Sequence, residues 1–482
     1  MYVYTEHEIR TADKEAERNG LSPIVLMENA GRSLFDKAVS FLNKNQRILV
    51  LAGKGNNGGD GIVLFRYLKL NGFQAELAFP LGMPKSDCAK HHFSFVQQNG
   101  FDTVKEREYE KKHYDVIIDA LLGVGTKHPL RDDVKKLIEW INKKDAFVIS
   151  IDLPTGVLAD SGEVSTAVKA DLTISLHGFK RSAFLLPSSS YYGHKEVVSI
   201  GLTQKGKWKV WTEQDVKRTW PVFPNFSHKG TFGTGYIIAG SDEMPGSALL
   251  AAKGAVRAGI GKLVVGTTRF AASVIAGEVP EATYKLDGLQ KAGKDDFPPK
   301  ISVCAIGPGI IPGKEAEKAV QAVLKTDLPV ILDAGALSKR TYPKERKKPI
   351  VLTPHPGEFS RLTGLSVEEI QQQRIEYASK FATEENVIVV LKGQYTVIAF
   401  PDETGIIQTT GNIALGKGGS GDVLTGMITA FLSFYQDEKA AVANAVYLHG
   451  LCADYYVKDK AARTMLASDI PELLPLVMKT FD

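Results

Sequence analysis

The chain has 482 residues, of which 44% are hydrophobic and 24% charged, and its formal net charge is +4. That length predicts two or three domains of ~100–200 residues each, which excludes a single small binding module. So small a net charge on so long a chain excludes a nucleic-acid binder and a membrane-surface protein, and it favours small molecules as ligands.

The first part of the chain alternates strand-like apolar runs with segments of helical period. Short buried runs separated by helices predict parallel strands joined by crossovers, which is a doubly wound α/β sheet. The expected strands are Arg47–Ala52, Phe73–Phe79, Tyr114–Ala120, Ala146–Ile151 and Asp171–Leu176. The expected helices are Glu6–Arg18, Ile24–Phe41, Gly61–Leu70, Ser86–Gln98 and Asp132–Ile141.

The alternation stops between residues 205 and 229, where Trp208, Trp211 and Trp220 fall close together with two prolines. We therefore place a domain boundary near residue 212, giving domains 1–212 and 213–482. The second domain resumes the α/β pattern. Its expected strands are Thr234–Ala239, Lys262–Val265, Val303–Ile306, Val330–Leu332, Ile350–Leu352, Val387–Leu391 and Thr396–Ala399, and its clearest helices are Ser247–Ala258 and Gly421–Phe434.

A glycine-rich loop, residues 53–61, follows the strand Arg47–Ala52 and precedes a helix. Its first glycines satisfy the G-x-G-x-x-G pattern, and Glu76 lies where a ribose-binding acid would, so a dehydrogenase must be considered. Against this, Asp60 puts a carboxylate where the positive end of a helix would meet a pyrophosphate. A purely structural glycine-rich turn is the other alternative.

Polar residues follow two further strands of the first domain, at Asp119 and at Asp152–Gly156. Ligands bind at the carboxyl ends of parallel strands, so Asn57, Asp119 and Asp152 are expected at one rim. With Thr155 they offer hard oxygen ligands that suit an alkali or alkaline-earth cation, and not zinc. Capping of the next helix is the structural alternative for each Asp.

The segments Asn56–Gly61, Asp119–Gly123 and Asp152–Gly156, in this order and spacing, resemble the epimerase domain of the NAD(P)H-hydrate repair enzymes. The resemblance implies a Rossmann-like three-layer αβα sandwich, a hydrated nicotinamide nucleotide as ligand, and potassium held by Asn57, Asp119 and Thr155. It also implies Asp152 as the proton-transferring group. The implied substrate contacts are Asn56, Asn57, Gly58, Gly59, Asp60, Gly123, Val124, Gly125, Thr126, Lys127, His128, Pro129 and Asp152.

A second glycine-rich segment, Thr410–Asp422, opens a helix in the second domain. Successive glycines before a helix N-terminus present free backbone N–H groups, which suit phosphate or the charge that develops during phosphoryl transfer. Phosphate would repel the Asp422 carboxylate unless it serves as a general base that takes a hydroxyl proton. An Asp that merely caps the helix is the alternative.

Five segments, at 228–230, 307–309, 355–358, 392–393 and 419–422, are together similar to the ribokinase-like dehydratase domain of the same repair system. The resemblance implies ADP or ATP as cosubstrate, Asp422 as the base, and magnesium held by Glu358 through water. The family's Asp-Ala-Asp reads Asp333-Ala-Gly335 here. The implied hydrate contacts are Gly309, His355, Pro356, Gly357, Glu358, Phe359, Ser360, Arg361 and Asp422. The implied nucleotide contacts are Lys392, Gly393, Gln394, Tyr395, Thr396, Asn412, Ile413, Ala414, Leu415, Gly416, Lys417, Gly418, Gly419, Ser420 and Gly421.

The resemblance thus predicts a bifunctional enzyme that epimerises hydrated NADH and NADPH and dehydrates the S hydrate at the expense of ADP or ATP. A ribokinase-like small-molecule kinase with an accessory nucleotide-binding domain, and a nucleotide sensor without turnover, are the competing hypotheses. Three cysteines, Cys88, Cys304 and Cys452, are too few and too far apart for a disulfide framework or a zinc site. With no basic, apolar leader and no apolar run of ~18–20 residues, we expect a cytoplasmic homo-oligomer that binds neither nucleic acid nor membrane.

Overall fold

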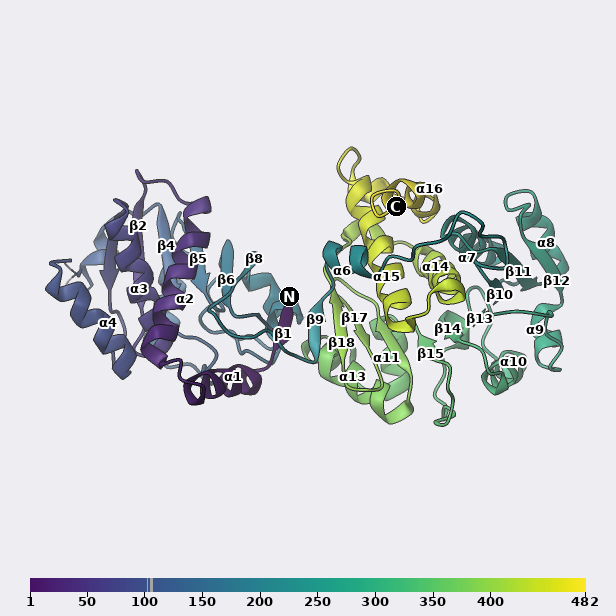
Figure 1. Cartoon of the computed structure of the whole chain (residues 1–482), viewed down its shortest axis with the longest axis horizontal. Coiled ribbons are helices and arrows are strands. Elements are labelled where there is room, and N and C mark those ends of the chain that lie inside the picture. Colours follow the sequence, from purple (N-terminus) through teal and green to yellow (C-terminus); the bar gives the residue numbers. More distant parts are fainter. Residues whose placement is uncertain (102, 105–106) are drawn as a thin grey trace. The chain divides into compact units, whose positions relative to one another are not determined.

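The computed structural model describes residues 1–101, 103–104 and 107–482 (Figure 1). The chain forms two compact units, Met1–Trp208 with Gln371–Gln373, and Lys209–Ile370 with Arg374–Asp482. Both units are α/β, as predicted. Within the described residues no helix combines the length and apolarity that crossing a membrane requires.

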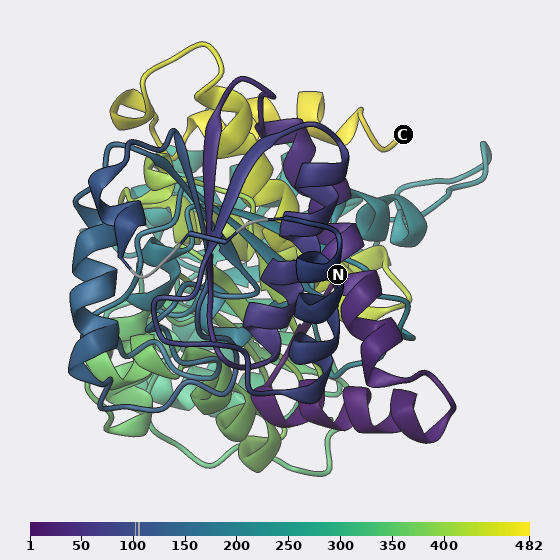
Figure 2. The same ribbon diagram turned by 90° about the vertical axis from the view of Figure 1, so that its left-hand side faces the viewer.

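The N-terminal unit is built on a six-stranded parallel sheet with the order β3-β2-β4-β5-β6-β8 (Figures 1 and 2). From β2 the chain first adds β3 on one side and then crosses over to add β4 on the other side of β2. The strand order therefore reverses between β2 and β4, which is the topological switch point of the sheet. The elements are β1 (Tyr2–Tyr4), α1 (Glu6–Arg18), α2 (Pro23–Ala38), β2 (Arg47–Ala52), α3 (Asn56–Leu70), β3 (Gln74–Ala78), α4 (Asp87–Gln98), β4 (Val116–Ala120), α5 (Asp132–Asn142), β5 (Phe147–Ile151), β6 (Leu172–Leu176), β7 (Phe179–Lys180) and β8 (His194–Val198).

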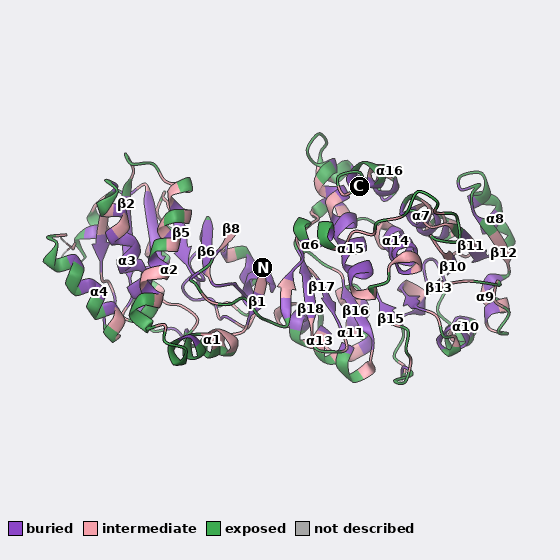
Figure 3. Cartoon of the chain, viewed as in Figure 1, coloured by how far each residue is buried: buried purple, intermediate pink, exposed green. Residues whose placement is uncertain are grey.

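Alternate residues of β2 enter different cores, because successive side chains of a strand point to opposite faces. Ile48 and Val50 pack in a cluster with residues of α2 and α3, whereas Leu49 and Leu51 pack with residues of α5. Helices therefore cover both faces of the sheet, and the predicted three-layer αβα sandwich is confirmed. Figure 3 shows the buried strands between helices whose outer faces are exposed.

The C-terminal unit contains a nine-strand run in the order β12-β11-β10-β13-β14-β15-β16-β17-β18. It is parallel as far as β16, and then β17 and β18 add antiparallel. Its switch point is between β10 and β13. The elements after β9 (Trp208–Val210) are α6 (Glu213–Thr219), β10 (Thr234–Ile238), α7 (Pro245–Arg257), β11 (Lys262–Thr267), α8 (Arg269–Ala276), β12 (Thr283–Leu286), α9 (Gly288–Ala292), β13 (Val303–Ile306), α10 (Lys314–Lys325), β14 (Val330–Leu332), β15 (Ile350–Leu352), α11 (Pro356–Thr363), α12 (Val367–Gln372), α13 (Arg374–Glu385), β16 (Ile388–Leu391), β17 (Thr396–Ala399), β18 (Gly405–Gln408), α14 (Ser420–Phe434), α15 (Glu438–Tyr456) and α16 (Asp469–Met478).

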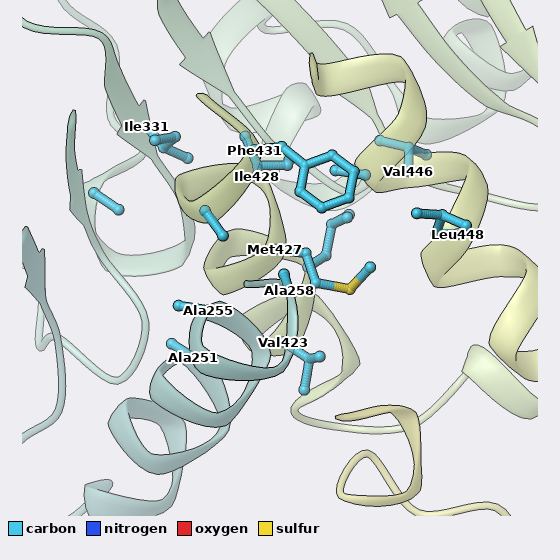
Figure 4. Packing of buried hydrophobic residues seen from close by; sticks show 14 of the residues in the cluster. Ala251, Ala255, Ala258, Ile331, Val423, Met427, Ile428, Phe431, Val446 and Leu448 are labelled. Atoms are coloured by element: carbon cyan, nitrogen blue, oxygen red, sulfur yellow. The ribbon is translucent and has the colours of Figure 1, made fainter. Parts of the chain in front are cut away.

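Helices α7, α14 and α15 form the main hydrophobic core of this unit (Figure 4). Ala251 and Ala255 of α7 meet the side of α14 that carries Val423 and Met427. The small residues let the two helix backbones approach closely. This packing fixes the N-terminal end of α14, which the second glycine-rich segment precedes.

Candidate active sites

The first candidate site is a cavity of about 530 Å³ in the N-terminal unit. It opens where β2 and β4 end, at the switch point where open α/β sheets bind their ligands. The predicted residues that line it are Asn56, Asn57, Asp60, Gly123, Val124, Gly125, Thr126 and Asp152. The structure thus brings together residues from all three segments that the sequence singled out.

Two glycines of the first loop are required by close backbone contacts. A Cβ on Gly53 would lie 1.8 Å from the carbonyl oxygen of Leu121, and one on Gly58 would lie 2.0 Å from that of Gly53. Helix α3 begins at Asn56, five residues earlier than predicted, so most of the glycine-rich loop is the first turn of the helix itself. Gly58 and Gly59 are accordingly buried in this helix.

Asp119 is completely buried and accepts four hydrogen bonds, all from neutral donors. They come from the backbone N–H groups of Leu121 and Thr155 and from the hydroxyls of Ser150 and Thr155, at 2.7–3.3 Å. Burial raises the pKa of the Asp119 carboxyl, although these hydrogen bonds oppose the shift. Nearby, Nδ2 of Asn57 is buried without a hydrogen-bond partner. Since amide O and N are interchangeable by a flip, this position can equally present an oxygen.

These observations fit a bound monovalent cation. A buried carboxylate held only by neutral donors lacks a counter-charge, and the unpartnered amide of Asn57 and the hydroxyl of Thr155 supply neutral oxygens. Potassium held there would supply the missing positive charge beside the cavity.

Asp152 lies at the cavity wall in a left-handed backbone conformation, with φ of 70°. It does not cap a helix: its carboxylate accepts from the ammonium of Lys180 and, at 3.1 Å, from the backbone N–H of Leu176. Lys180 is 1% exposed and also donates to the carbonyls of Leu176 and Gly178. Lys180 was not predicted as a site residue, although it follows the carboxyl end of a predicted strand.

Two further acids line the same cavity, Asp13 and Asp60. Burial, together with the charges of Asp152 and Asp13, raises the pKa of Asp60 well above its usual range. Burial and the charge of Asp152 also raise the pKa of Asp13. One ammonium thus faces three carboxyl groups, and two of these, Asp13 and Asp60, have raised pKa values. Asp13 is also a residue that the sequence did not single out.

The predicted contacts that do not line this cavity are Gly58, Gly59, Lys127, His128 and Pro129. A ring nitrogen of His128 lies 2.9 Å from the carbonyl oxygen of Gly156, and the His128–Pro129 peptide bond is cis. Glu76, the acid that the dehydrogenase hypothesis needs, instead accepts hydrogen bonds from Lys112 and Tyr114.

The second candidate site is a cavity of about 940 Å³ at the carboxyl ends of β14, β15 and β16 and the N-terminus of α14. The predicted residues that line it are His355, Pro356, Glu358, Lys392, Gly393, Gln394, Thr396, Asn412, Ile413, Leu415, Gly416, Lys417, Gly418, Gly419, Ser420, Gly421 and Asp422. Asp333, Thr410 and His449 line it as well and were not predicted.

Charged groups converge at the floor of this cavity around Lys392. Its ammonium donates to Asp333 at 3.1 Å and lies 3.9 Å from Glu358. Burial disfavours the charged form of Lys392, but Asp333 and Glu358 outweigh it and raise its pKa. Asp333 is buried and also accepts from Thr425 at 2.8 Å, so the first acid of the Asp333-Ala-Gly335 sequence is an anchor for Lys392.

Asp422 is the third residue of α14 and therefore not its N-cap. The N-cap is Gly419, which has φ of 92° and no side chain, so no side-chain cap competes with an anion for the N–H groups of Gly421 and Asp422, whereas that of Ser420 donates to the carbonyl of Lys417 at 3.4 Å. Burial raises the pKa of the Asp422 carboxyl to about 6, with help from Asp333, while a hydrogen bond from Ser247 and the charge of Lys392 oppose the shift. A carboxyl with this pKa is mostly ionised at neutral pH and can accept a proton.

Glu358 suits a magnesium ion held through water. One of its oxygens accepts from the backbone N–H of His355 at 2.8 Å, while the other lies 3.5 Å from the His355 ring. In the described part of the chain no three His, Cys, Asp or Glu side chains are grouped as direct metal ligands. The Glu358 carboxylate beside a phosphate site is the kind of ligand that magnesium uses, because this ion commonly keeps its waters and binds phosphates beside one or two carboxylates.

Seven predicted residues do not line this cavity, namely Gly309, Gly357, Phe359, Ser360, Arg361, Tyr395 and Ala414. Phe359 is buried against Phe381, and Ser360 donates to the carbonyl of Leu365. Ala414 is buried within a short 3-10 turn. Gly309, with φ of 64°, lies beside Ser247 and Gly240, where a Cβ would come within 2.7 Å of the Ser247 Cβ. Ser247, which contacts Asp422, was also not predicted.

Comparison with known proteins agrees with this geometry. A family model described as NAD(P)H-hydrate dehydratase matches residues 236–476, and one described as YjeF-related protein N-terminus matches residues 23–182. The bifunctional NAD(P)H-hydrate repair enzyme Nnr of Thermofilum pendens is 32% identical over 99% of this chain and 96% of its own length. The ADP-dependent (S)-NAD(P)H-hydrate dehydratase of Bacillus subtilis is 51% identical over 56% of this chain and 98% of its own length.

Solved structures match the C-terminal unit. The crystal structure of the ADP/ATP-dependent NAD(P)H-hydrate dehydratase of Bacillus subtilis, co-crystallized with ATP/Mg²⁺, is 50% identical, with a TM-score of 0.56 over 57% of this chain and 98% of the other. A ribokinase-like superfamily protein of Enterococcus faecalis is 25% identical, with a TM-score of 0.51 over 58% of this chain and 98% of the other. These matches agree with the predicted ribokinase-like α/β fold of that unit.

Proposed function

The chain belongs to the family of bifunctional NAD(P)H-hydrate repair enzymes, and we propose that each of its two cavities carries one of the two activities. The N-terminal cavity interconverts the R and S hydrates of NADH and NADPH. The C-terminal cavity dehydrates the S hydrate with ADP or ATP. The observation that carries the second assignment is Asp422, a partly buried base placed at an uncapped helix N-terminus beside Lys392.

In the dehydratase unit the hydroxyl on the hydrated ring must become a better leaving group. Asp422 takes the proton of this hydroxyl, whose oxygen attacks the terminal phosphoryl group of ADP or ATP. The free N–H groups at the start of α14 and the ammonium of Lys392 bind the phosphate oxygens. The ring nitrogen then expels phosphate, and loss of a ring proton regenerates the dihydronicotinamide. Glu358 would hold magnesium through water, which neutralises phosphate charge.

In the epimerase unit we assign proton transfer to Asp152, whose carboxylate Lys180 holds in place through an ion pair. Asp60, whose pKa is raised by burial, holds a proton more readily than a free carboxyl and can then donate a hydrogen bond. Asn57, Asp119 and Thr155 would hold potassium behind the cavity wall. We further propose that the enzyme is a cytoplasmic homo-oligomer, a state that light scattering on the purified chain measures directly.

The function is tested by mixing the full chain with hydrated NADH and either ADP or ATP. We expect the absorbance of the reduced nicotinamide ring to return, with one phosphate released per ring restored. A kinase of the ribokinase class would consume nucleotide without this signal, and a nucleotide sensor would give neither. The kinase hypothesis also leaves the N-terminal cavity without a role.

The potassium assignment makes a separate prediction. Epimerisation should slow when potassium is replaced by tetramethylammonium, because Asp119 then lacks its counter-charge. Asp119→Asn keeps the size of the side chain but removes that charge, so the variant should lose the dependence on potassium. Dehydration of the S hydrate serves as the internal control. If the unaltered chain epimerised equally fast in potassium and in tetramethylammonium, the assignment would be refuted.

A further inference from the structure

Arg374 is a buried cation that the reaction described so far does not use. It is the first residue of α13, and its side chain is completely buried. Burial lowers its pKa to about 10, so the guanidinium is still charged at neutral pH. Within the described residues its Nε and Nη1 atoms have no hydrogen-bond partner. Burying a charge in this way is costly, and the dipole of a helix repels a cation at its N-terminus, so the packing of α13 does not explain this residue.

The guanidinium of Arg374 lies directly behind the wall of the C-terminal cavity. Its Nη2 atom donates to the carbonyl oxygens of Leu391 at 2.9 Å and Lys392 at 3.0 Å. A Cβ on Gly393 would lie 2.7 Å from Nη1, so the guanidinium occupies the space where a side chain at this position would begin. Lys392 and Gly393 line the cavity, and Arg374 is not among the lining residues. Arg374 therefore supports the segment Lys392–Gly393 from the side opposite the cavity.

The two hydrogen bonds fix the orientation of the peptide between Lys392 and Gly393. In a planar trans peptide the C=O and N–H groups point in opposite directions. The preceding peptide shows this arrangement, because its carbonyl, that of Leu391, accepts from Arg374. Its N–H, that of Lys392, donates to the carbonyl of Pro354 at 2.9 Å. The N–H of Gly393 likewise points away from the guanidinium, and we expect it to face an anion bound in the cavity.

The charges at the floor of the cavity call for a second cation. Lys392 interacts with three carboxyl groups there, those of Asp333, Glu358 and Asp422. These groups repel the phosphates of ADP or ATP, and Lys392 carries a single positive charge against all of them. A guanidinium fixed behind the wall adds positive charge in a buried position, where attraction is screened far less than in water.

We infer that Arg374 is a positioning residue for the nucleotide, holding Lys392 and Gly393 in the orientation that binds phosphate and attracting the polyphosphate through the cavity wall. This inference rests on the proposed dehydratase function. The bound polyphosphate then supplies the counter-charge that the guanidinium lacks. A purely structural role, in which Arg374 only ties the end of β16 to α13, is the alternative. The two roles differ in whether the effect of Arg374 depends on the phosphates of the ligand.

The test compares ATP with adenosine, which has the same base and sugar but no phosphate, as ligands of the full chain. Arg374→Gln keeps an N–H donor for the two carbonyls and removes the charge. We expect it to raise the Kd for ATP about tenfold and to change the Kd for adenosine by less than roughly twofold. Arg374→Lys keeps the charge and should restore most of the affinity for ATP.

Arg346→Gln is the matched control. Arg346 also donates to backbone carbonyls, including those of Leu324 and Leu328, but it does not line or adjoin the segment Lys392–Gly393. Its loss should lower the melting temperature and leave the ratio of the two Kd values as it is in the unaltered chain.

Calorimetric titration gives the Kd values, and thermal unfolding establishes that each variant is folded. Equal losses of affinity for ATP and adenosine, no loss for ATP, or a Lys variant that binds ATP no better than the Gln variant would overturn the inference. Arg374→Met, which removes the charge and keeps a long side chain, replaces the Gln variant if that one does not fold. If neither folds, Arg374 has a structural role and the inference is wrong. Dehydration by the unaltered chain is measured in parallel, because its absence would refute the proposed function whatever the Kd values are.

Discussion

As a general base, Asp422 needs a raised pKa in order to hold the proton that it accepts. It must also be ionised at the working pH in order to accept that proton. Its surroundings meet both demands, since burial and Asp333 raise its pKa while Ser247 and Lys392 limit the rise to about 6. A carboxyl that holds its proton more tightly in the folded chain than in the unfolded one is destabilised when it ionises. Ionised Asp422 therefore lowers the free energy of unfolding at neutral pH.

Asp422→Asn removes both the general base and the buried carboxylate, so it should lower the activity and raise the stability. Dehydration should fall ~10²–10⁴-fold because the general base is lost, while epimerisation and ATP binding persist. The variant should also be more stable at pH 7 by roughly 2–3 kcal/mol, and this gain should shrink as the pH falls from about 7 to about 4, where the unaltered carboxyl becomes protonated. Asp459→Asn, at an exposed site, is the control. Near-normal dehydration by the Asn variant would refute the assignment.

Ser247→Ala tests what holds the pKa of Asp422 down. Without the hydrogen bond from Ser247 the pKa of Asp422 should rise, so the acid limb of the kcat profile for dehydration should move to higher pH. The rate should be reduced most near pH 6 and least near pH 8, where the base is ionised in both proteins. Ser247→Thr keeps the hydroxyl and should keep the limb in place. A uniform loss at every pH would mean that Ser247 has only a structural role.

Residues that carry a local pattern could be predicted from the sequence, whereas those that only the fold brings in could not. The glycine-rich segments and the acids at strand ends have neighbours in the sequence that identify them, and most of them line the two cavities. Lys180 and Asp13 have no such pattern around them. Each reaches the first candidate site only because folding places it beside Asp152 or within reach of its charge.

At the scale of elements, buried strands were easier to predict than edge strands. β2 and β13 are continuous apolar runs and were predicted with the bounds they have. β8 and β12 lie at the ends of their sheets and are only partly buried, so they lack the apolar signal. The start of α3 was missed because glycines normally argue against a helix, whereas here close contacts with neighbouring backbone require them.

The α7–α14 contact provides a prediction at this scale. A Cβ on Gly426 would lie 2.0 Å from the carbonyl oxygen of Ala251, so Gly426→Ala must push the two helices apart. We expect a loss of about 1–3 kcal/mol, the usual cost of overpacking, and a lower kcat because Ser247 and Asp422 move apart. The measurement is calorimetry of the full chain, following the transition that ATP shifts. Gly246→Ala, at a site with no atom within 4 Å, should leave this transition unchanged or raise it.

At the scale of the whole molecule, each unit has its own core and its own cavity. All proposed epimerase residues lie between Asp13 and Lys180, and all proposed dehydratase residues lie after residue 240. The N-terminal unit is within the usual size range of domains, and the C-terminal unit is slightly above it. The two activities should therefore be separable by cutting the chain.

The position of the cut matters for the second fragment. Thr212 caps α6 through a capping box with Asp215, so a fragment that starts at residue 213 loses a cap that is typically worth about 1 kcal/mol. We therefore expect fragment 209–482 to be somewhat more stable than fragment 213–482, with equal activity.

Fragment 1–212 should interconvert the two epimers without nucleotide. Fragment 213–482 should dehydrate only the S hydrate and stall when that epimer of an equilibrated mixture is used up, because spontaneous epimerisation is then the slow step. Adding fragment 1–212, without any covalent link, should allow dehydration to continue. Adding the Asp152→Asn variant of this fragment should not. Both measurements follow the absorbance of the reduced ring, with circular dichroism to establish that each fragment is folded. If fragment 213–482 alone consumed both epimers at one rate, or if both folded fragments were inactive, the division of labour between the units would be wrong.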